Sequence, residues 1–216
     1  MRRRNVTNAH EKLISLGNVL VGIKEKLNFK ELFKNDNPVC LELGMGKGKF
    51  IIDLAKKNPN INYIGVEKYE GVILQAGKKL LEEGINNLIL VCAEAKDLAE
   101  IIEEHSIDTL YLNFSDPWPK ARHEKRRLTS NTFLPIYEKI LIDNHIIFKT
   151  DNRGLFEYSL INLTKNSYKI LSLSLDLHKD ALDLITTEYE DKLSKNGPIY
   201  FVEVKKWKFT SEVKIK

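Results

Sequence analysis

Glu42 is a carboxylate placed immediately before a glycine-rich stretch, and this combination indicates a binding site for a small molecule. The stretch Gly44–Gly48 reads Gly-Met-Gly-Lys-Gly and follows the apolar run 38–43. Glycines such as Gly44 and Gly46 let the backbone turn tightly and let a ligand approach it, although a purely structural turn would also use them. A carboxylate here would repel a pyrophosphate and attract a cation. The pattern therefore favours S-adenosylmethionine, which carries a sulfonium and an amino group but no phosphate, over NAD.

Two further carboxylates follow the next two apolar runs. Glu67 ends the run 62–67, about 20 residues beyond Gly44, which is the usual spacing for an acidic residue that binds the ribose hydroxyls of an adenosine. Because NAD and S-adenosylmethionine both contain adenosine, Glu67 does not choose between them, and an exposed ion pair with Lys68 is the alternative. Glu94 follows the third run, where it can either bind an adenine amino group or cap the next helix.

The most specific local pattern is Asp-Pro-Trp-Pro-Lys at 116–120, directly after the apolar run 108–114. Two prolines fix the loop and remove backbone donors. Trp118 offers a ring face on which a nucleobase can stack, and Asp116 lies where the reacting group of a ligand is expected. A rigid turn with a packed tryptophan is the alternative, but an acid, two prolines and a tryptophan at one strand end favour a functional loop.

A basic segment continues directly from this loop. The formal net charge of +4 and the pI of about 8.8 are only a weak indication of a polyanionic partner. The segment itself is more informative, because it begins at Lys120 and continues through Arg122, His123, Glu124, Lys125, Arg126 and Arg127. Lysine and arginine neutralise phosphates. The position of the segment predicts a nucleic acid lying across the pocket mouth, with a solvated lysine-rich surface as the alternative.

Polar residues also follow the later apolar runs. Asp151 comes after the run 145–150, where it can contribute to the same site or cap the next helix. The polar cluster 186–190 precedes the last apolar run, and its composition alone predicts a loop.

These side chains need a scaffold that brings strand ends together, and the remaining sequence predicts one. Apolar runs near 38–43, 62–67, 88–94, 108–114 and 145–150 alternate with helical patterns, which is typical of βαβ units and a mainly parallel sheet. Strands near 168–175 and 198–207 have no clear helix between them and predict an antiparallel edge. We therefore expect an α/β fold with a doubly wound, mainly parallel sheet of about seven strands, whose ligands bind beyond the carboxyl ends of the strands.

The first 35 residues read as a separate extension. Arginines occupy positions 2–4, and apolar residues between 13 and 27 recur at helical spacing, with a break at Gly17 or Gly22. Turn-forming residues at 35–38 mark the junction. We expect a helical, basic extension over 1–35 and a ligand-binding domain over 36–216.

The two cysteines limit which cellular compartment and which disulfide or metal chemistry can be expected. Cys40 and Cys92 lie inside apolar runs without metal-ligand spacing, which predicts small core residues and neither a disulfide nor a metal site. No apolar run is long enough to cross a bilayer, and the N-terminus lacks the apolar part of a signal peptide. We therefore expect a cytoplasmic protein without a metal or a membrane partner.

Several of these stretches together resemble the bacterial tRNA (guanine-N7-)-methyltransferase family. The matching stretches are ELGMGKG at 42–48, GVEK at 65–68, DPWPKARHEKRRL at 116–128, KTDN at 149–152, TEYE at 187–190 and GPIYF at 197–201. The stretch 116–128 is the most specific. The resemblance implies a Rossmann-like class I methyltransferase domain over 36–216, S-adenosylmethionine as cofactor, and N7 of the guanine at position 46 in the tRNA variable loop as target.

The resemblance also implies roles for single residues. The cofactor site would contain Glu42, Gly44, Gly46, Glu67, Glu94 and Asp116, with Asp116 as the catalytic candidate. The substrate guanosine would be bound by Lys120, Asp151, Thr187, Glu188, Tyr189 and Glu190. RNA would be contacted by Arg122, His123, Glu124, Lys125, Arg126 and Arg127.

Three other functions fit part of the pattern. The loop at 116–119 is similar to the motif of adenine N6 methyltransferases, although that motif has two consecutive prolines. An NAD-dependent oxidoreductase is disfavoured by Glu42 and by the glycine spacing. An RNA-binding protein with an inactive pocket is disfavoured by the presence of Glu42, Glu67 and Asp116.

Overall fold

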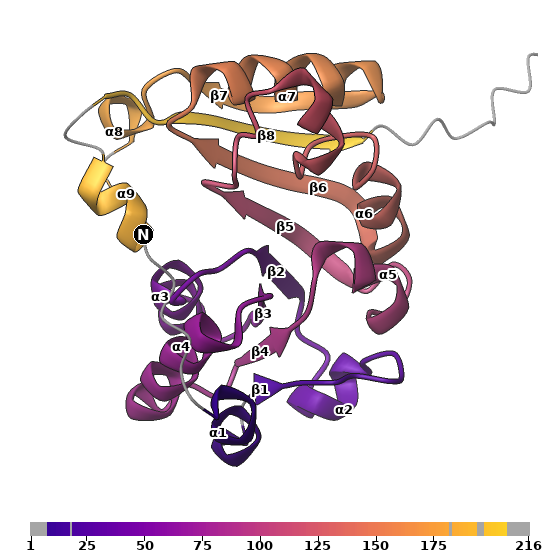
Figure 1. Cartoon of the computed structure of the whole chain (residues 1–216), viewed down its shortest axis with the longest axis vertical. Helices are drawn as coiled ribbons and strands as arrows, with labels where there is room; N and C mark the ends of the chain where they lie inside the picture. Colours follow the sequence, from indigo (N-terminus) through magenta and orange to yellow (C-terminus); the bar gives the residue numbers. More distant parts are fainter. Residues whose placement is uncertain (1–7, 18, 182, 194–196, 207–216) are drawn as a thin grey trace, which may run out of the picture.

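A single mixed sheet forms the centre of the molecule, with helices on both faces (Figure 1). The computed structural model describes residues 8–17, 19–181, 183–193 and 197–206. In this part of the chain the sheet has eight strands in the order β1-β4-β3-β2-β5-β6-β8-β7. The strands are β1 Val19–Leu20, β2 Val39–Leu43, β3 Asn62–Glu67, β4 Leu88–Cys92, β5 Ile107–Asn113, β6 Leu141–Thr150, β7 Tyr168–Ser174 and β8 Tyr200–Lys206.

Strand direction confirms the predicted mainly parallel sheet with an antiparallel edge. Neighbouring strands from β1 to β6 pair in parallel, whereas β8 pairs antiparallel with both β6 and β7. β2 and β3 are buried along their whole length, which explains why their sequences lack polar alternation. The predicted extension of the last strand to Trp207 lies outside the described residues.

Two apolar layers cover the sheet. On one face α1 (Ala9–Leu16), α3 (Lys49–Lys57) and α4 (Glu70–Glu83) pack through Leu13, Ile51 and Ile73. On the other face α5 (Leu98–Ile101), α6 (Leu134–Ile140) and α7 (Arg153–Lys165) contribute to a second core. The remaining helical segments are α2 Phe29–Phe33, η1 Ala95–Asp97, η2 Ala121–Arg126, α8 Leu177–Asp180 and α9 Glu188–Leu193. None of the described helices is both long enough and apolar enough to cross a membrane.

The N-terminal segment adds one short strand, β1, to the seven strands expected from the sequence. α1 ends at Leu16, and its C-cap Gly17, with a φ of 72°, stops the helix where a break was predicted. Val19 then pairs with Leu90 and Leu20 with Val91 at the β4 edge, so Leu20 lies in a strand and not on a helix. Helical spacing of apolar residues cannot distinguish a two-residue strand from a helix turn, because the signal needs a longer window. Positions 2–4 lie outside the described residues.

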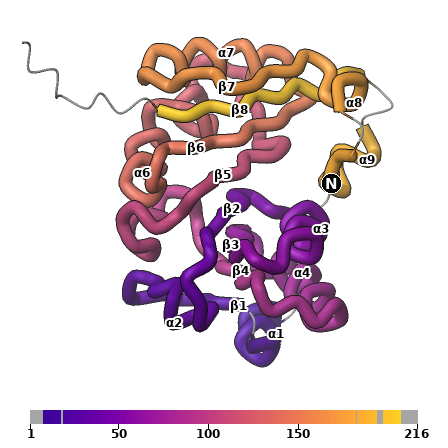
Figure 2. The backbone as a smooth tube through the Cα atoms, turned by 180° about the vertical axis from the view of Figure 1, so that it is seen from behind, coloured from indigo at the N-terminus to yellow at the C-terminus, as the bar shows by residue number. Residues whose placement is uncertain are grey.

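The order of the strands reverses between β2 and β5, and this reversal fixes the site. From β2 the sheet extends through β3, β4 and β1 on one side, and through β5 and β6 on the other (Figure 2). In parallel sheets, ligands bind beyond the carboxyl ends of the strands at such a reversal. Glu42 near the end of β2 and Asn113 at the end of β5 both lie at this position.

Candidate active site

Glu42 is a buried carboxylate with one oxygen still available. Only 1% of the residue is exposed, and its Oε1 accepts a hydrogen bond of 2.8 Å from Asn113 Nδ2. Glu42 Oε2 and Asn113 Oδ1 are buried and have no hydrogen-bond partner among the residues that the structure describes. Burial raises the pKa of Glu42 to about 7, against the opposing effects of the Asn113 hydrogen bond and the charge of Lys149. Because unsatisfied buried acceptors are costly, this pair is suited to a ligand that brings an ammonium or amino group.

The glycine-rich turn wraps around the end of the neighbouring strand β3. Gly44 and Gly46 have φ values of 78° and 59°, which favour glycine because a side chain is strained there. The Gly44 amide donates to Val66 O at 2.8 Å, and the Gly46 amide donates to Glu67 Oε2 at 3.3 Å. A Cβ built on either glycine meets nothing within 4 Å. The positive φ angles thus explain these glycines, and open space beside them remains for a ligand.

Gly65 in β3 leaves the space into which a side chain of this turn packs. A Cβ on Gly65 would collide with Met45 Sδ and would lie 3.1 Å from Leu90 Cδ2 and 3.4 Å from Ile51 Cγ2. Met45 belongs to the turn and is 6% exposed. The absence of a side chain at Gly65 therefore lets Met45 anchor the glycine-rich turn to the core.

Replacing Gly65 with alanine is expected to lower the free energy of unfolding by about 1–3 kcal/mol and to weaken cofactor binding, because Met45 must move. Urea unfolding and calorimetric titration with S-adenosylmethionine measure both effects. Gly154→Ala in α7 is the matched control, since its Cβ would meet only Asn152 Oδ1 at 3.5 Å. If both variants behave alike, Met45 does not anchor the turn.

Glu67 and Glu94 differ in how firmly they are held. Glu67 is 8% exposed, and its oxygens accept from the backbone amides of Gly46 and Tyr69 at 3.3 and 3.0 Å. Burial raises its pKa, and the carboxylate is held by these amides without an ion pair to Lys68. Each oxygen keeps a lone pair that a ribose hydroxyl can use. Glu94 is an exposed side chain that makes no capping hydrogen bond, so the capping alternative is not what the structure shows.

The backbone of the loop around Asp116 is strained, and neighbouring arginine side chains hold the loop in place. Phe114 and Trp118 have φ values of 50° and 41°, unusual for residues of this size, and such strain persists only where neighbours impose it. Arg127 donates to Trp118 O at 3.3 and 3.1 Å from Nε and Nη2, and the Arg126 guanidinium lies 4.8 Å from the Trp118 ring centroid. Asp116 itself is exposed and makes no hydrogen bond or ion pair within the described ranges. The loop thus presents its carboxylate to solvent.

The basic segment divides into internal and outward-facing residues. Arg127 stacks over the Tyr158 ring at 4.3 Å, and the Tyr158 hydroxyl donates to Glu124 at 3.1 Å. His123 lies edge-on to Trp118. Arg122 and Lys125 are exposed. Of the six residues predicted to contact RNA, His123, Glu124 and Arg127 make contacts that hold the loop in place. The exposed cations Arg122 and Lys125 can bind a polyanion.

Asp151 is not the cap of the next helix. Asn152 has that role, because its Oδ1 accepts from the Leu155 amide at 2.8 Å. Asp151 is exposed at the carboxyl end of β6, and its Oδ2 lies 3.4 Å from the Tyr189 hydroxyl, which donates to it. The Tyr189 ring in turn lies 5.3 Å from that of Phe114. These contacts join the predicted substrate segment to the start of the Asp116 loop.

The stretch 187–190 begins a helix, which corrects the loop expected from composition. Thr187 Oγ1 accepts from the Glu190 amide at 2.9 Å, and Glu190 Oε2 accepts from the Thr187 amide at 3.2 Å, which is a capping box. Glu190 is completely buried, with Lys149 at 2.8 Å and His178 at 2.9 Å. Glu188 lies 3.7 Å from Lys47. Thr187 and Glu190 thus already have internal partners, whereas half of Tyr189 is exposed.

Three residues of this region were not predicted. Asn113 is recognisable in the sequence as the polar residue at the end of an apolar run, shortly before the Asp116 loop. Lys149 and His178 could not be recognised, because the first looks like the polar end of a strand and the second like an isolated histidine. Among the described residues, no group of three or more histidine, cysteine or acidic side chains could hold a metal ion.

The fold and this site together define a methyltransferase of the S-adenosylmethionine-dependent class. Among solved structures, the 16S rRNA methyltransferase KamB is similar with a TM-score of 0.64 and 13% identity, covering 86% of this chain and 98% of KamB. A mutant 16S rRNA (adenine(1408)-N(1))-methyltransferase from Catenulisporales acidiphilia, solved with its cosubstrate SAM, has a TM-score of 0.61 and 12% identity over 87% of this chain and 95% of that one.

Sequence similarity identifies the family within this class of methyltransferases. The profile of the family described as "Putative methyltransferase" matches residues 36–202. A tRNA (guanine-N(7)-)-methyltransferase of Geobacillus sp. (strain WCH70) is 49% identical over 210 residues, which cover 95% of this chain and 96% of the relative. The chain belongs to the tRNA (guanine-N(7)-)-methyltransferase family.

Proposed function

We propose that this chain transfers a methyl group from S-adenosylmethionine to N7 of the guanine at position 46 in the variable loop of tRNA. The observation that carries the proposal is the buried Glu42–Asn113 pair, whose free acceptors lie where the strand order reverses, close to the Asp116 loop. Family membership supports the same reaction. The proposed substrate, tRNA, fits the cytoplasmic location expected from the sequence.

The residues present fit S-adenosylmethionine. Glu42 and Asn113 would hold its amino group, Glu67 its ribose hydroxyls, and Gly44 and Gly46 would let it approach the backbone. Glu94 and Asp116 would complete the pocket on either side. When bound, the cofactor supplies an electrophilic methyl group on a sulfonium.

Little acid–base chemistry is required of the protein. Guanine N7 has an in-plane lone pair and needs no deprotonation before it attacks the methyl group, so catalysis rests on alignment and electrostatics. The purine gains positive charge as the bond forms. The Asp116 carboxylate would stabilise this charge and accept hydrogen bonds from N1 or the exocyclic amine of the guanine.

The substrate would be held by the outward-facing residues around this carboxylate. We assign guanosine binding to Lys120, Asp151 and the segment Thr187–Glu190 as a unit, in which Tyr189 faces outward and contacts Asp151 and Glu190 faces inward. The tRNA backbone would lie along the basic segment 122–127. Its exposed cations supply affinity, and its internal contacts keep the Asp116 loop in shape.

Arg122→Ala and Lys125→Ala are each expected to weaken tRNA binding and to reduce the slope of log affinity against log salt by about 1, since each removes one phosphate contact. Filter binding across a salt series measures this slope. Lys165→Ala, an exposed cation at the far end of α7, should leave the slope unchanged. An unchanged slope in the first two variants would place the tRNA on another surface.

Nucleoside analysis of the product tests the proposed reaction. Unmodified tRNA transcript is incubated with the protein and labelled S-adenosylmethionine, digested to nucleosides and separated. Label in N7-methylguanosine supports the proposal. Label in N6-methyladenosine would replace it with an adenine methyltransferase, and tRNA binding without any label would replace it with a binding-only protein.

A further inference from the structure

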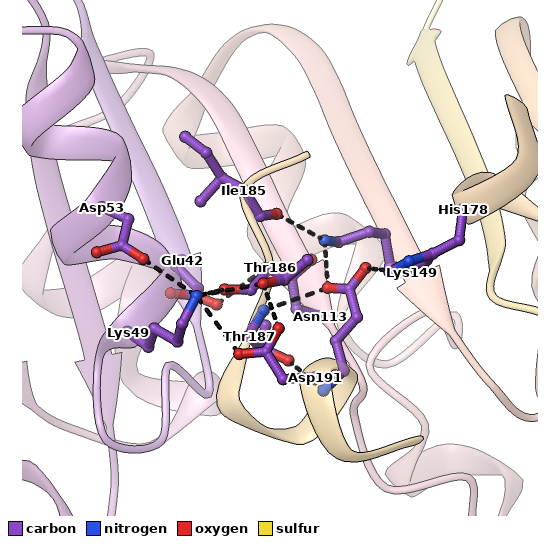
Figure 3. Close-up of polar contacts among 11 residues, drawn as sticks. Glu42, Lys49, Asp53, Asn113, Lys149, His178, Ile185, Thr186, Thr187 and Asp191 are labelled. Atoms are coloured by element: carbon purple, nitrogen blue, oxygen red, sulfur yellow. Dashed lines mark hydrogen bonds and ion pairs between the residues drawn. The ribbon is translucent and has the colours of Figure 1, made fainter. Parts of the chain in front are cut away.

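The segment 185–193 is held over the site by a buried charge cluster. Lys149 Nζ donates to Glu190 Oε2 at 2.8 Å, and the side chains of these two residues are only 5% and 0% exposed. His178 Nε2 lies 2.9 Å from the other oxygen, Oε1. Lys149 also donates to Ile185 O at 3.4 Å, so one ammonium group holds both the helix and the chain that leads into it (Figure 3).

Lys149 also connects this segment to the loop that carries Asp116. Its backbone oxygen accepts from the Phe114 amide at 2.9 Å, and its ammonium group lies 5.9 Å from the Phe114 ring and 4.8 Å from the Phe50 ring. Phe114 is the strained residue at which the Asp116 loop begins. A displacement of the 185–193 segment would therefore be transmitted to this loop.

A second, weaker attachment lies at the solvent side. Lys49 of α3 donates to Thr186 O and Oγ1 at 3.1 and 3.2 Å and lies 3.6 Å from Asp191 (Figure 3). Figures 1 and 2 show α9 beside α3. These partly exposed contacts tolerate adjustment more readily than the buried cluster, because solvent can replace them.

Glu190 has little capacity left for a nucleobase. One oxygen accepts from Lys149 and from the Thr187 amide, and the other faces His178. Removing a partner from a buried carboxylate is costly. A guanine that displaced these partners would have to offset that cost, whereas the neighbouring Tyr189 is half exposed and could meet the guanine at the smaller cost of its 3.4 Å hydrogen bond to Asp151.

We propose that Lys149 and His178 are positioning residues that fix the 185–193 segment through Glu190, so that Glu190 anchors the guanine-binding segment and does not itself contact the guanine. This inference rests on the proposed function, because it presumes that the segment meets the nucleobase. His178 gives the cleanest test, since within the described part of the chain its side chain contacts only Glu190, and since it is partly exposed its variants should fold.

His178→Ala is expected to raise KM for tRNA about tenfold while kcat and the Kd for S-adenosylmethionine change less than twofold. Amide exchange at 187–191 should become faster, even without RNA. His178→Gln, which can still donate to Glu190, should restore most of the KM. Lys179→Ala is the matched control, because that neighbouring cation is exposed and pairs with Asp176.

A double-mutant cycle of His178→Ala and Glu190→Gln decides between anchor and direct contact. The anchor predicts that the double variant resembles Glu190→Gln alone, because both changes break one interaction. Multiplicative effects on KM, an unchanged KM in His178→Ala, or an equal loss of cofactor affinity would each overturn the inference. If the proposed function is wrong, the unmodified protein will not methylate tRNA. In that case amide exchange in His178→Ala still measures whether His178 holds the 187–191 segment.

Discussion

Replacing Asp116 with alanine is expected to lower kcat for tRNA methylation by about 10²- to 10³-fold, the usual effect of removing one group aimed at developing charge. The Kd for S-adenosylmethionine should change less than about threefold. The reason is geometric: Asp116 is exposed at the tip of a strained loop, whereas the buried acceptors that fit the cofactor belong to Glu42 and Asn113. Single-turnover kinetics and calorimetric titration measure the two quantities.

Asp116→Asn and Glu100→Ala complete this experiment. Asparagine keeps the size of the side chain and one acceptor but loses the negative charge, so most of the kcat should remain lost. Glu100→Ala removes an exposed carboxylate on α5 and should behave like the unmodified protein. An equal loss of kcat and cofactor affinity in Asp116→Ala would show that Asp116 is a cofactor ligand only.

Glu42→Gln is expected to reduce the affinity for S-adenosylmethionine by about 100-fold or more, as happens when one partner of a buried charge pair is neutralised. The pH dependence should change with it. Because the pKa of Glu42 is raised to about 7 in the folded protein, the unmodified protein should lose cofactor affinity as pH falls below 7. The variant should show a flat profile over this range.

The same substitution should stabilise the protein without cofactor. A carboxyl group whose folded pKa is raised stabilises the fold at low pH, and this contribution is lost as pH rises through about 7. The charged, partly unsatisfied Glu42 therefore lowers the free energy of unfolding at pH 8, and Glu42→Gln should raise it by about 1 kcal/mol or more. Urea unfolding at pH 5 and pH 8 measures the difference. A variant that is less stable at pH 8 yet binds cofactor normally would show that Glu42 is structural.

Strand ends were predictable because parallel strands bring their carboxyl ends to one edge. Glu42 and Glu67 lie at the ends of apolar runs, Asp116 and Asp151 follow such runs, and that local pattern was enough to expect one shared site. The conformational demand on Gly44 and Gly46 was also readable from the sequence. What these side chains bind was suggested by the position of Glu42 and by the family pattern.

The buried anchor could not be predicted, because its partners are distant in sequence. Lys149 and Glu190 are 41 residues apart and meet only through the sheet and the chain that follows β7. The capping box was different: Thr-x-x-Glu at 187–190 is a local helix-start signal that the polar composition obscured. β1 escaped prediction because two residues are too few for any periodicity.

Mapping the methylated nucleotide tests whether the protein methylates N7 of guanine 46 in tRNA. Two unmodified tRNA transcripts, one with guanine and one with adenine at position 46, are incubated with the protein and S-adenosylmethionine, then reduced and cleaved with aniline at N7-methylguanosine. We expect strand cleavage at position 46 in the first transcript and none in the second. Cleavage at another guanine, or methyl incorporation without cleavage, would contradict it.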